Sequence, residues 1–332
     1  MLRRFCLMAT LLAVTLTSFA AEELVVFSGR KDKFLKPVTE AFTRQTGIKV
    51  IIHSAKSAAL LNKLIAEKDR TDADVFISND AGSLQIGADR GLFKAINASI
   101  AGQVPANYRA RDNTWIGLSA RARVLVVNTT VRDIGFVNSV FDLADPRLKG
   151  RLGITDSTNG SFIAGVTVYV QAVGEAKVQE WLKGIKANAE GKVFAKHSKI
   201  VKAVAMNKRA IGLVNHYYIY RYLDKYPDAP IRILLPDQGK KGMGIAWNVA
   251  GVAVSKYTNK QKQVDKFLTF LVSEAGQKMF AEVNREYPVR EGVHAAAEVP
   301  ALNSYRVADV PMPDLGKYRI QTIDLLDRVG MP

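Results

Sequence analysis

The stretch that decides the fold is ELVVFSGRKDKFLKPVTEAFTRQTGIKVIIHSA, residues 23–55. Residues 24–27 form an apolar run that predicts a buried strand, and residues 48–52 predict a second strand. Between the two runs, apolar residues recur at helical spacing and make one face of a helix: Phe34, Leu35, Val38, Ala41 and Phe42. Gly47 stands where a helix-terminating glycine belongs. A strand, a helix and a strand in this order imply a parallel sheet.

The same alternation continues along the chain. Ser57 is placed to cap a helix, residues 73–78 predict a buried strand, and Asp80 is placed to cap the next helix. Two long apolar strands are expected at residues 123–128 and 245–254, with a second α/β segment between them. We therefore expect an α/β fold of two lobes, each with its own sheet, joined by two crossover strands.

Four loops directly follow predicted strands, and they are the candidate lining of a ligand site. They span residues 28–31, 78–80, 158–162 and 215–218. Ligands of open α/β sheets bind beyond the carboxyl ends of the strands. In a two-lobed chain these ends can face each other, so we expect the four loops to line an interlobe cleft.

The first 20 residues have the pattern of a secretory signal. Two arginines precede the apolar run of residues 7–16, and Ser18 and Ala20 occupy the small-residue positions of a cleavage site. An uncleaved anchor is the alternative, but the run is short for a membrane span, which needs about 20 apolar residues. We expect residues 1–20 to be a signal peptide and the mature protein to be soluble in the periplasm.

Composition limits the chemistry of the mature chain. The only cysteine, Cys6, lies within the expected signal, so the cleaved, mature chain would have no cysteine. This excludes disulfides, thiol catalysis and cysteine-bound zinc in the mature protein. The net charge is +16, and it is about +14 once Arg3 and Arg4 leave with the signal. Lysines and arginines are scattered rather than grouped, and an exported protein rarely meets DNA. We therefore expect no nucleic-acid partner. The basic charge indicates anion binding, contact with an anionic membrane surface, or simply a solvated basic surface.

The tyrosines are concentrated in one segment, GLVNHYYIYRYLDKYPD, residues 212–228. It holds five of the eleven tyrosines, and Tyr217 and Tyr218 are adjacent. Phenolate is a hard, anionic oxygen donor, and a bound cation can displace its proton. Neighbouring side chains diverge on regular helices and strands, so both can reach one ion only at an irregular place such as a strand-to-helix junction. Taken alone, the pair is better explained by packing than by a metal site.

Cationic and small residues on the same loops suggest an anion site. Asn159, Gly160 and Ser161 precede an apolar helix, whose free N–H groups can hold an anion; an ordinary capped helix start is the alternative. Arg30 and Lys31 follow the first strand, and an arginine there can bind carbonate or carboxylate through two hydrogen bonds. The alternative is that both side chains are simply solvated.

The remaining polar residues do not form a catalytic constellation. Arg121 and Arg123 begin the first crossover strand, and one of them is expected to face the cleft. His216 flanks the tyrosines and could orient one of them. No HExxH, GxSxG or P-loop motif occurs, so we do not expect an enzyme.

Taken together, these segments resemble the periplasmic ferric-ion-binding proteins that supply bacterial ABC importers. The resemblance covers nearly all of the mature chain. It rests on five segments: VVFSGRKDKFLKPVTEAFTRQTGIKV, ADVFISND, LSARARVLVVNTT, VNHYYIYR and FLTFLVSEAGQKMFAEVNREYPV. It implies a type II periplasmic binding fold, Fe³⁺ as the ligand, and Tyr217 and Tyr218 as metal ligands.

The chain also departs from the family pattern. Lys31 stands where some members have a histidine ligand, Asn79 where some have a glutamate ligand, and residues 159–162 where some have a third tyrosine. The resemblance therefore implies a branch that completes the metal site with carbonate or bicarbonate. The resemblance also implies anion-binding residues. The family's anion-binding positions at the start of the second-lobe helix match Asn159, Gly160 and Ser161, and its anion-binding positions on neighbouring loops match His197 and Asn215.

The resulting hypothesis is specific. Residues 21–123 with 248–298 form the amino-terminal lobe, and residues 124–247 with 299–332 form the other. A monomer traps Fe³⁺ through the two tyrosines, with synergistic anions on Arg30, Lys31, Arg123 and the matched positions, and a membrane permease of an ABC importer receives the iron. The alternative ligand is a phosphorylated or other anionic organic solute.

Overall fold

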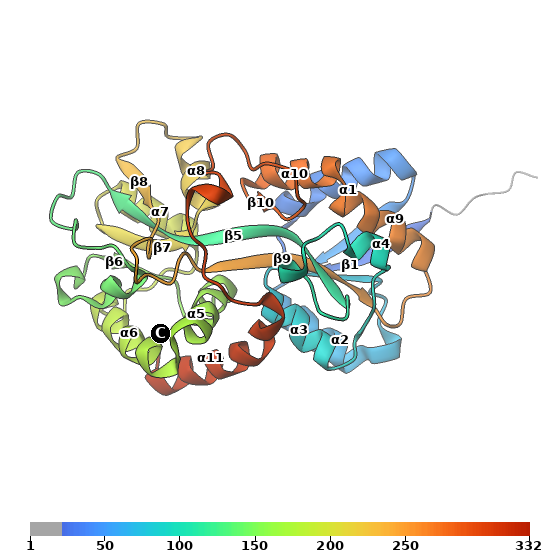
Figure 1. Cartoon of the computed structure of the whole chain (residues 1–332), viewed down its shortest axis with the longest axis horizontal. Helices are drawn as coiled ribbons and strands as arrows, with labels where there is room; N and C mark the ends of the chain where they lie inside the picture. The colour runs from blue at the N-terminus through green and yellow to red at the C-terminus, as the bar shows by residue number, and fades with distance from the viewer. Residues whose placement is uncertain (1–21) are drawn as a thin grey trace, which may run out of the picture.

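The computed structural model describes residues 22–332 and shows two α/β lobes side by side, linked by long strands (Figure 1). The expected signal peptide lies outside the described residues. Within the described range, no helix has both the length and the apolar character that a membrane crossing requires.

One hydrogen-bonded path of strands runs through both lobes, in the order β2-β1-β3-β9-β5-β7-β6. β10 and β8 also pair with β5, and β4 pairs with β9. The strand bounds are β1 Glu23–Ser28, β2 Lys49–Ser54, β3 Val75–Ser78, β4 Phe93–Lys94, β5 Trp115–Asn128, β6 Leu152–Gly153, β7 Ile211–Asn215, β8 Ile231–Leu234, β9 Trp247–Ser255 and β10 Tyr287–Pro288.

β5 is the strand that joins the lobes. Its first part, residues 115–122, pairs with β9 in the sheet of the amino-terminal lobe. Its second part, from Arg123 onward, pairs antiparallel with β7 and β8 in the other sheet. β5 is thus one of the expected crossover strands between the lobes, and it belongs to both sheets. Arg121 and Arg123 lie on opposite sides of this transition.

Helices cover both sheets (Figure 1). Their bounds are α1 Asp32–Thr46, α2 Ser57–Glu67, α3 Ala81–Asp89, α4 Ala98–Ala101, α5 Gly160–Val173, α6 Glu175–Ala189, α7 His197–Ala205, α8 Tyr217–Leu223, α9 Gln261–Val272, α10 Glu274–Asn284 and α11 Leu315–Val329.

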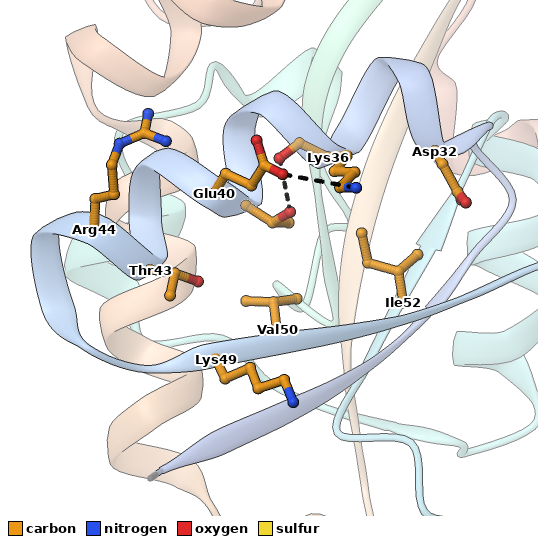
Figure 2. A pocket seen from close by; sticks show the side chains of 9 residues that line it. Asp32, Lys36, Glu40, Thr43, Arg44, Lys49, Val50 and Ile52 are labelled. Carbon is orange, nitrogen blue, oxygen red and sulfur yellow. Dashed lines mark hydrogen bonds and ion pairs between the residues drawn. The ribbon is translucent and has the colours of Figure 1, made fainter.

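The first unit confirms the parallel arrangement expected from residues 23–55. β1 and β2 pair in parallel, and α1 ends at Gly47, whose φ of 75° is left-handed. α1 covers the edge strand β2, leaving a shallow groove of about 520 Å³ between them (Figure 2). Lys36 and Glu40 pair along the helix at 3.8 Å, with both side chains about half exposed or more. The charged residues that line the groove are all exposed: Asp32, Lys36, Glu40, Arg44 and Lys49.

Local capping explains how the loops near the cleft are held. The Asp80 side chain accepts from the Ser83 N–H and caps α3 as expected. Ser57 does not cap α2 but begins it, and its Oγ accepts from the Asn79 N–H at 3.2 Å. That bond ties two cleft loops of the amino-terminal lobe together.

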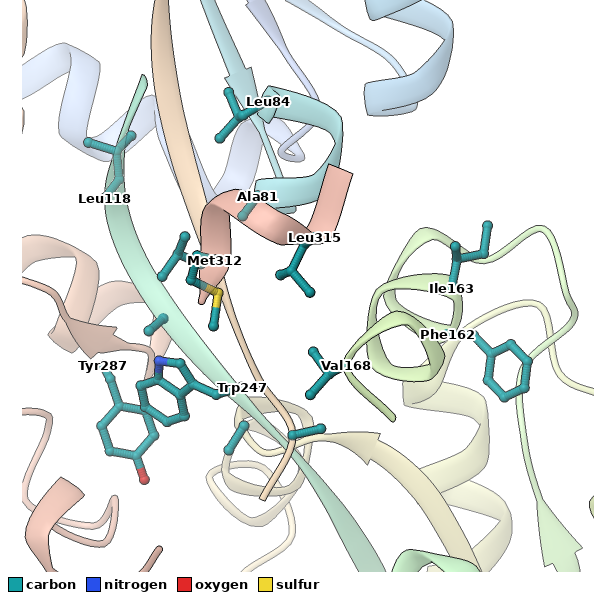
Figure 3. Close-up of a cluster of buried hydrophobic side chains, with 14 of the residues drawn as sticks. Ala81, Leu84, Leu118, Phe162, Ile163, Val168, Trp247, Tyr287, Met312 and Leu315 are labelled. Atoms are coloured by element: carbon teal, nitrogen blue, oxygen red, sulfur yellow. The ribbon is translucent and has the colours of Figure 1, made fainter. Parts of the chain in front are cut away.

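The carboxyl-terminal helix α11 was not expected from the sequence, and it contacts both lobes. Met312 and Leu315 lie at its start, between Ala81 and Leu84 at α3 and Val168 on α5 (Figure 3). All five side chains are buried, so their apolar contact stabilises the junction of the lobes. α11 also packs on α6.

Candidate metal and anion site in the interlobe cleft

A cavity of about 700 Å³ lies between the lobes and collects loops from both. The amino-terminal lobe contributes Gly29, Arg30, Lys31, Phe34, Lys56, Ser57, Ala58, Asn79, Asp80, Arg121 and Glu286. The other lobe and α11 contribute Asp156, Thr158, Asn159, Gly160, Ser161, Ile163, Ala195, Lys196, His197, Ser198, Tyr217, Tyr218 and Arg319. This size is typical of sites for small ligands.

Tyr217 and Tyr218 both line this cavity, at the strand-to-helix junction expected for them. β7 ends at Asn215 and α8 begins at Tyr217, so the backbone turns between the two elements. The two rings lie 4.5 Å apart between centroids, with an angle of 35° between their planes. Both tyrosines belong to the first turn of α8, and His216 before them also has helical backbone angles, so the two rings lie against each other at the very start of a helix.

Asn215 orients the first of these tyrosines. Its Nδ2 donates to the Tyr217 Oη and to the Ser161 Oγ, each at 3.3 Å. Its own Oδ1 accepts from Arg123 Nη1 at 3.1 Å. The buried amide therefore fixes the position of the Tyr217 hydroxyl oxygen beside the cavity.

His197 is a neutral donor next to the second tyrosine. Its Nδ1 accepts from the Asn215 N–H at 3.0 Å, which leaves Nε2 as the N–H position. Burial and then the charge of Arg123 hold the pKa of His197 well below its ordinary value. Its ring lies 5.1 Å from that of Tyr218. His197 can therefore donate to an anion without adding a positive charge.

The environment of Tyr218 opposes ionisation of both phenols at once. The neighbouring Tyr217 and then burial raise the pKa of Tyr218. Two adjacent phenolates would repel each other in a poorly solvated site. A bound multivalent cation removes this conflict, because it attracts both oxygens.

The amino terminus of α5 faces the same cavity. The Asn159 side chain accepts from the N–H groups of Ser161 and Phe162 at 3.0 and 3.2 Å and caps the helix. Gly160 is exposed at the first helical position, so its N–H points away from the helix ladder. The Ser161 hydroxyl lies between this turn and Asn215. This loop can present neutral donors to an anion.

Arg30 is held in a buried ion pair on the opposite wall. Its Nη2 lies 2.6 Å from Glu286 Oε2, and its Nη1 donates to Ser119 Oγ at 3.0 Å. Ser119 Oγ in turn donates to the same carboxylate at 2.6 Å. Burial raises the pKa of Glu286, but the charges of Arg30 and Arg121 outweigh it and lower the pKa overall. Glu286 therefore stays ionised, and its carboxylate already pairs with the Nη2 of the Arg30 guanidinium.

Arg121 and Arg123 have different environments. Arg121 lines the cavity, is 5% exposed, and its Nη1 has no hydrogen-bond partner among residues 22–332. Arg123 lies behind the cavity lining, against Asn215 and His197, where it fixes both. Burial lowers the pKa of both guanidiniums without making either neutral at physiological pH.

The charges of the lining favour an anionic or strongly neutralised ligand. Six cationic side chains, Arg30, Lys31, Lys56, Arg121, Lys196 and Arg319, face three carboxylates, Asp80, Asp156 and Glu286. No cluster of three or more His, Cys, Asp or Glu suited to a metal occurs among the described residues.

The structure brings most of the predicted site residues to one cavity: Tyr217, Tyr218, Arg30, Lys31, Asn159, Gly160, Ser161 and His197. Asn215 and Arg123 support them from behind. Sequence reasoning missed Glu286 and Arg319. The first lies within NREYPV, a segment already noted for its resemblance, while the second lies on a helix that carries no motif.

A profile of the family described as bacterial extracellular solute-binding protein matches residues 71–311. The chain belongs to the bacterial extracellular solute-binding proteins. Among these it is 30% identical to the major ferric iron-binding protein of Neisseria meningitidis over 338 residues, which cover 99% of this chain and 98% of that protein. The resemblance to ferric-ion-binding proteins expected from the sequence is confirmed.

Solved structures of this solute-binding family share the fold. Iron-bound HitA from Pseudomonas aeruginosa superposes with a TM-score of 0.87 at 27% identity, covering 93% of this chain and 99% of that chain. A Trichodesmium protein (IdiA, FutA) in complex with iron and citrate gives a TM-score of 0.82 at 30% identity, covering 93% and 100%. The expected two-lobed periplasmic binding fold is confirmed.

Proposed function

We propose that this protein captures Fe³⁺ in the periplasm and delivers it to the membrane permease of an ABC importer. Tyr217 and Tyr218 supply two phenolate ligands. One observation carries this proposal: two adjacent tyrosines project from a strand-to-helix junction into a cleft rich in cationic groups. Relatives over nearly the full length are named as ferric iron-binding proteins, which supports the same ligand.

The charge balance requires an anion beside the metal. Two phenolates offset two of the three charges of Fe³⁺, and the remaining charge would lie next to Arg121 and Lys31. Like charges at close range are costly away from bulk water. A carbonate or bicarbonate adds negative charge and oxygen ligands together. It takes the place of the protein ligands that Lys31 and Asn79 do not provide.

Neutral donors on the second lobe give this anion a place. Gly160 and Ser161 at the start of α5, His197 and Asn215 surround the tyrosines with N–H and O–H groups. Arg30, Lys31 and Arg123 add charge from the opposite and rear sides. Closure of lobes bounded at residues 21–123 with 248–298, and 124–247 with 299–332, would then bury the complex. Binding and transport, rather than catalysis, follow from this arrangement.

An anionic organic solute, such as a sugar phosphate, is the second candidate. The excess of cationic lining residues favours it as well. The phenol O–H groups of the tyrosines could donate to a phosphate, but a phosphate does not need the two anionic oxygens that an adjacent pair can supply to Fe³⁺. Relatives over nearly the full length are named as ferric iron-binding proteins. We therefore rank it below ferric iron.

The deciding experiment is a titration of metal-free protein with Fe³⁺ supplied as a weak chelate, followed by gel filtration and metal analysis. We expect one iron per chain in bicarbonate buffer, on a monomer. Parallel calorimetry with a sugar phosphate should show no comparable binding. Tight sugar-phosphate binding without iron retention would favour the second candidate.

A further inference from the structure

Two residues that flank the tyrosine pair donate to the same helix end in the other lobe. His216 precedes the pair, and its Nε2 donates to the Arg285 carbonyl oxygen at 2.7 Å. Arg221 follows the pair on α8, and its Nη2 donates to the Val283 carbonyl oxygen, also at 2.7 Å. Both acceptors lie at the carboxyl end of α10, and α8 and α10 lie above β5 in the view of Figure 1. The segment that carries the tyrosines is therefore tied to the amino-terminal lobe at both ends.

The end of α10 is a suitable acceptor for these donors. The last four carbonyl groups of a helix have no N–H partner within the helix, and their partial negative charge attracts donors and cations. α10 ends at Asn284, and Arg285 caps it with a left-handed φ of 57°. The donors of the second lobe therefore satisfy carbonyl groups that α10 itself leaves open.

The imidazole of His216 connects two elements at the point where β5 changes sheets. Its Nδ1 accepts from the Ala122 N–H at 3.2 Å, so Nε2 is the nitrogen that carries the hydrogen and donates to Arg285. The His216 N–H also donates to the Ala122 carbonyl at 3.1 Å. The residue is 1% exposed, so leaving either ring nitrogen without a partner would be costly. One buried ring thus joins β5 to the end of α10.

The same helix end holds a residue against which Tyr217 packs. Asn284 Nδ2 donates to the Phe34 carbonyl at 3.1 Å and fixes the start of α1. The Phe34 ring meets the Tyr217 ring edge to face, with 6.1 Å between centroids and 70° between planes. The His216 ring meets Tyr217 in the same way, at 5.6 Å and 81°. Tyr217 therefore contacts one ring from each lobe, and the end of α10 is bonded to both.

We propose that His216 is a positioning residue, which fixes the tyrosine pair at the cleft by bonding the start of α8 to the end of α10. Neither His216 nor Arg285 belongs to the cavity lining, so the bond acts through Tyr217 and Tyr218. Without it, the tyrosines remain but are held less precisely against the amino-terminal lobe. This inference rests on the proposed function, because the ion that the pair binds is the Fe³⁺ of that proposal.

Two nearly isosteric substitutions separate the two bonds of the ring. His216→Gln places an amide N–H near the position of Nε2, so it can still donate to the Arg285 carbonyl. His216→Asn places its oxygen near the position of Nδ1, so it can accept from the Ala122 N–H but cannot reach Arg285. The two variants therefore differ in the proposed tie while both keep a buried polar group.

The affinity for Fe³⁺ is measured by equilibrium dialysis against a competing chelator, with thermal unfolding recorded in parallel. His216→Asn should bind iron about tenfold more weakly, as expected for a lost residue that orients a metal ligand, and His216→Gln should stay within about threefold of the unmodified protein. His53→Asn is the matched control on the exposed end of β2, and it should stay within about twofold.

The absorption band of ferric phenolate separates positioning from ligation. Both variants should retain the band at one iron per chain, because both phenolates are present. Affinity in His216→Asn equal to that of the unmodified protein would overturn the proposal. Loss of the band in His216→Asn would overturn it too, since His216 would then act on the metal itself. An equal loss of affinity in both variants would show that the bond to Arg285 is not the cause.

A measurement on the unmodified protein applies even if His216→Asn does not fold. Linkage is reciprocal, so a bond that raises metal affinity about tenfold is itself stabilised about tenfold by the metal. NMR of isotope-labelled histidine reports hydrogen exchange of the His216 Nε2–H, with Ga³⁺ as a diamagnetic ion of the same charge. Exchange should slow about tenfold on loading. Unchanged exchange in Ga³⁺-loaded protein would overturn the positioning role.

The two proposals fail in different ways. No iron retained by the unmodified protein would remove the proposed function. Tight iron binding with the phenolate band, but with equal affinity in His216→Asn, would remove only the positioning role of His216.

Discussion

The two walls of the interlobe cleft differ in how their polar groups are satisfied. On the second-lobe wall, Asn215, His197 and Ser161 form a neutral network around the tyrosines. On the amino-terminal wall, Arg30 and Glu286 form a buried ion pair. The first, which we call the neutral wall, presents uncharged donors next to the tyrosines, with the charge of Arg123 behind them. The second, the charged wall, can hold what neutralises the metal. Selectivity for iron should therefore depend on the first wall, and neutralisation on the second.

The largest effect is expected from breaking the neutral wall. Tyr217→Phe or Tyr218→Phe removes one anionic oxygen and keeps the ring packing. Loss of a residue that only orients a metal ligand typically costs about 10- to 100-fold in affinity, so loss of a ligand itself should exceed about 100-fold. Equilibrium dialysis against a competing chelator measures it, and circular dichroism should show an unchanged fold.

Tyr226→Phe is the matched control, because Tyr226 lies beyond α8 and is 47% exposed. It should bind iron normally. Equal loss in all three variants, or none in any, would show that the pair is not the site.

Acidification comes next and acts on the same wall. The proximity of Tyr217 and burial raise the pKa of Tyr218 above its ordinary value near 10, so its phenol is protonated at neutral pH. Iron binding must expel that proton, and affinity therefore rises with pH and falls on acidification. For the one proton of the Tyr218 phenol, we expect about tenfold weaker binding per pH unit. Proton release measured during ferric titration should fall by one in Tyr218→Phe, and an unchanged release would contradict this assignment.

Removing the synergistic anion from the buffer tests whether iron held by the neutral wall also needs the anion held by the charged wall. Rigorous removal of bicarbonate and citrate should weaken ferric binding about tenfold or more, the range of lost charge-assisted contacts. Arg123→Ala should imitate part of this loss, because it frees Asn215 and His197. Unchanged affinity in depleted buffer would point to an additional protein ligand, with His197, His216 or Asp80 the first to examine.

The smallest effect on iron binding is expected from the ion pair of the charged wall. Glu286→Gln leaves Arg30 buried without its partner, so the free energy of unfolding should fall by about 3 kcal/mol at pH 7. The pKa of Glu286 is lowered in the folded protein, so its contribution is present above the unfolded value near 4.3 and is lost as pH falls through the folded value. The stability difference between variant and unmodified protein should therefore shrink in acid. A constant difference would show that Glu286 is not ionised.

Much of the fold could be predicted because its signals are local. The apolar spacing in α1, the glycine at its end and the cap at Asp80 act within one turn of the chain. The junction between β7 and the tyrosines is also local. The lobe boundaries stay a prediction, and α11, which contacts both lobes, was missed. Its position depends on distant partners rather than on its own pattern.

The sequence predicted the site residues that lie on a loop directly after a predicted strand. It did not predict contacts between residues that are far apart in the sequence. Arg30 was expected to hold an anion, but its main partner, Glu286, lies 256 positions away, and no spacing rule connects them. Arg121 and Arg123 were both candidates for the cleft, and only Arg121 lines the cavity, because β5 passes from one sheet to the other between them. Whether Arg30 and Lys31 contact the anion stays a prediction.

The most direct test of the central claim is the visible absorption spectrum of pure protein titrated with Fe³⁺ in bicarbonate buffer. Phenolate bound to ferric iron should give a charge-transfer band that saturates at one iron per chain. The band should disappear in the double variant Tyr217→Phe/Tyr218→Phe, while Tyr226→Phe retains it. A colourless protein that nevertheless binds iron, or a band that survives the double variant, would contradict the account.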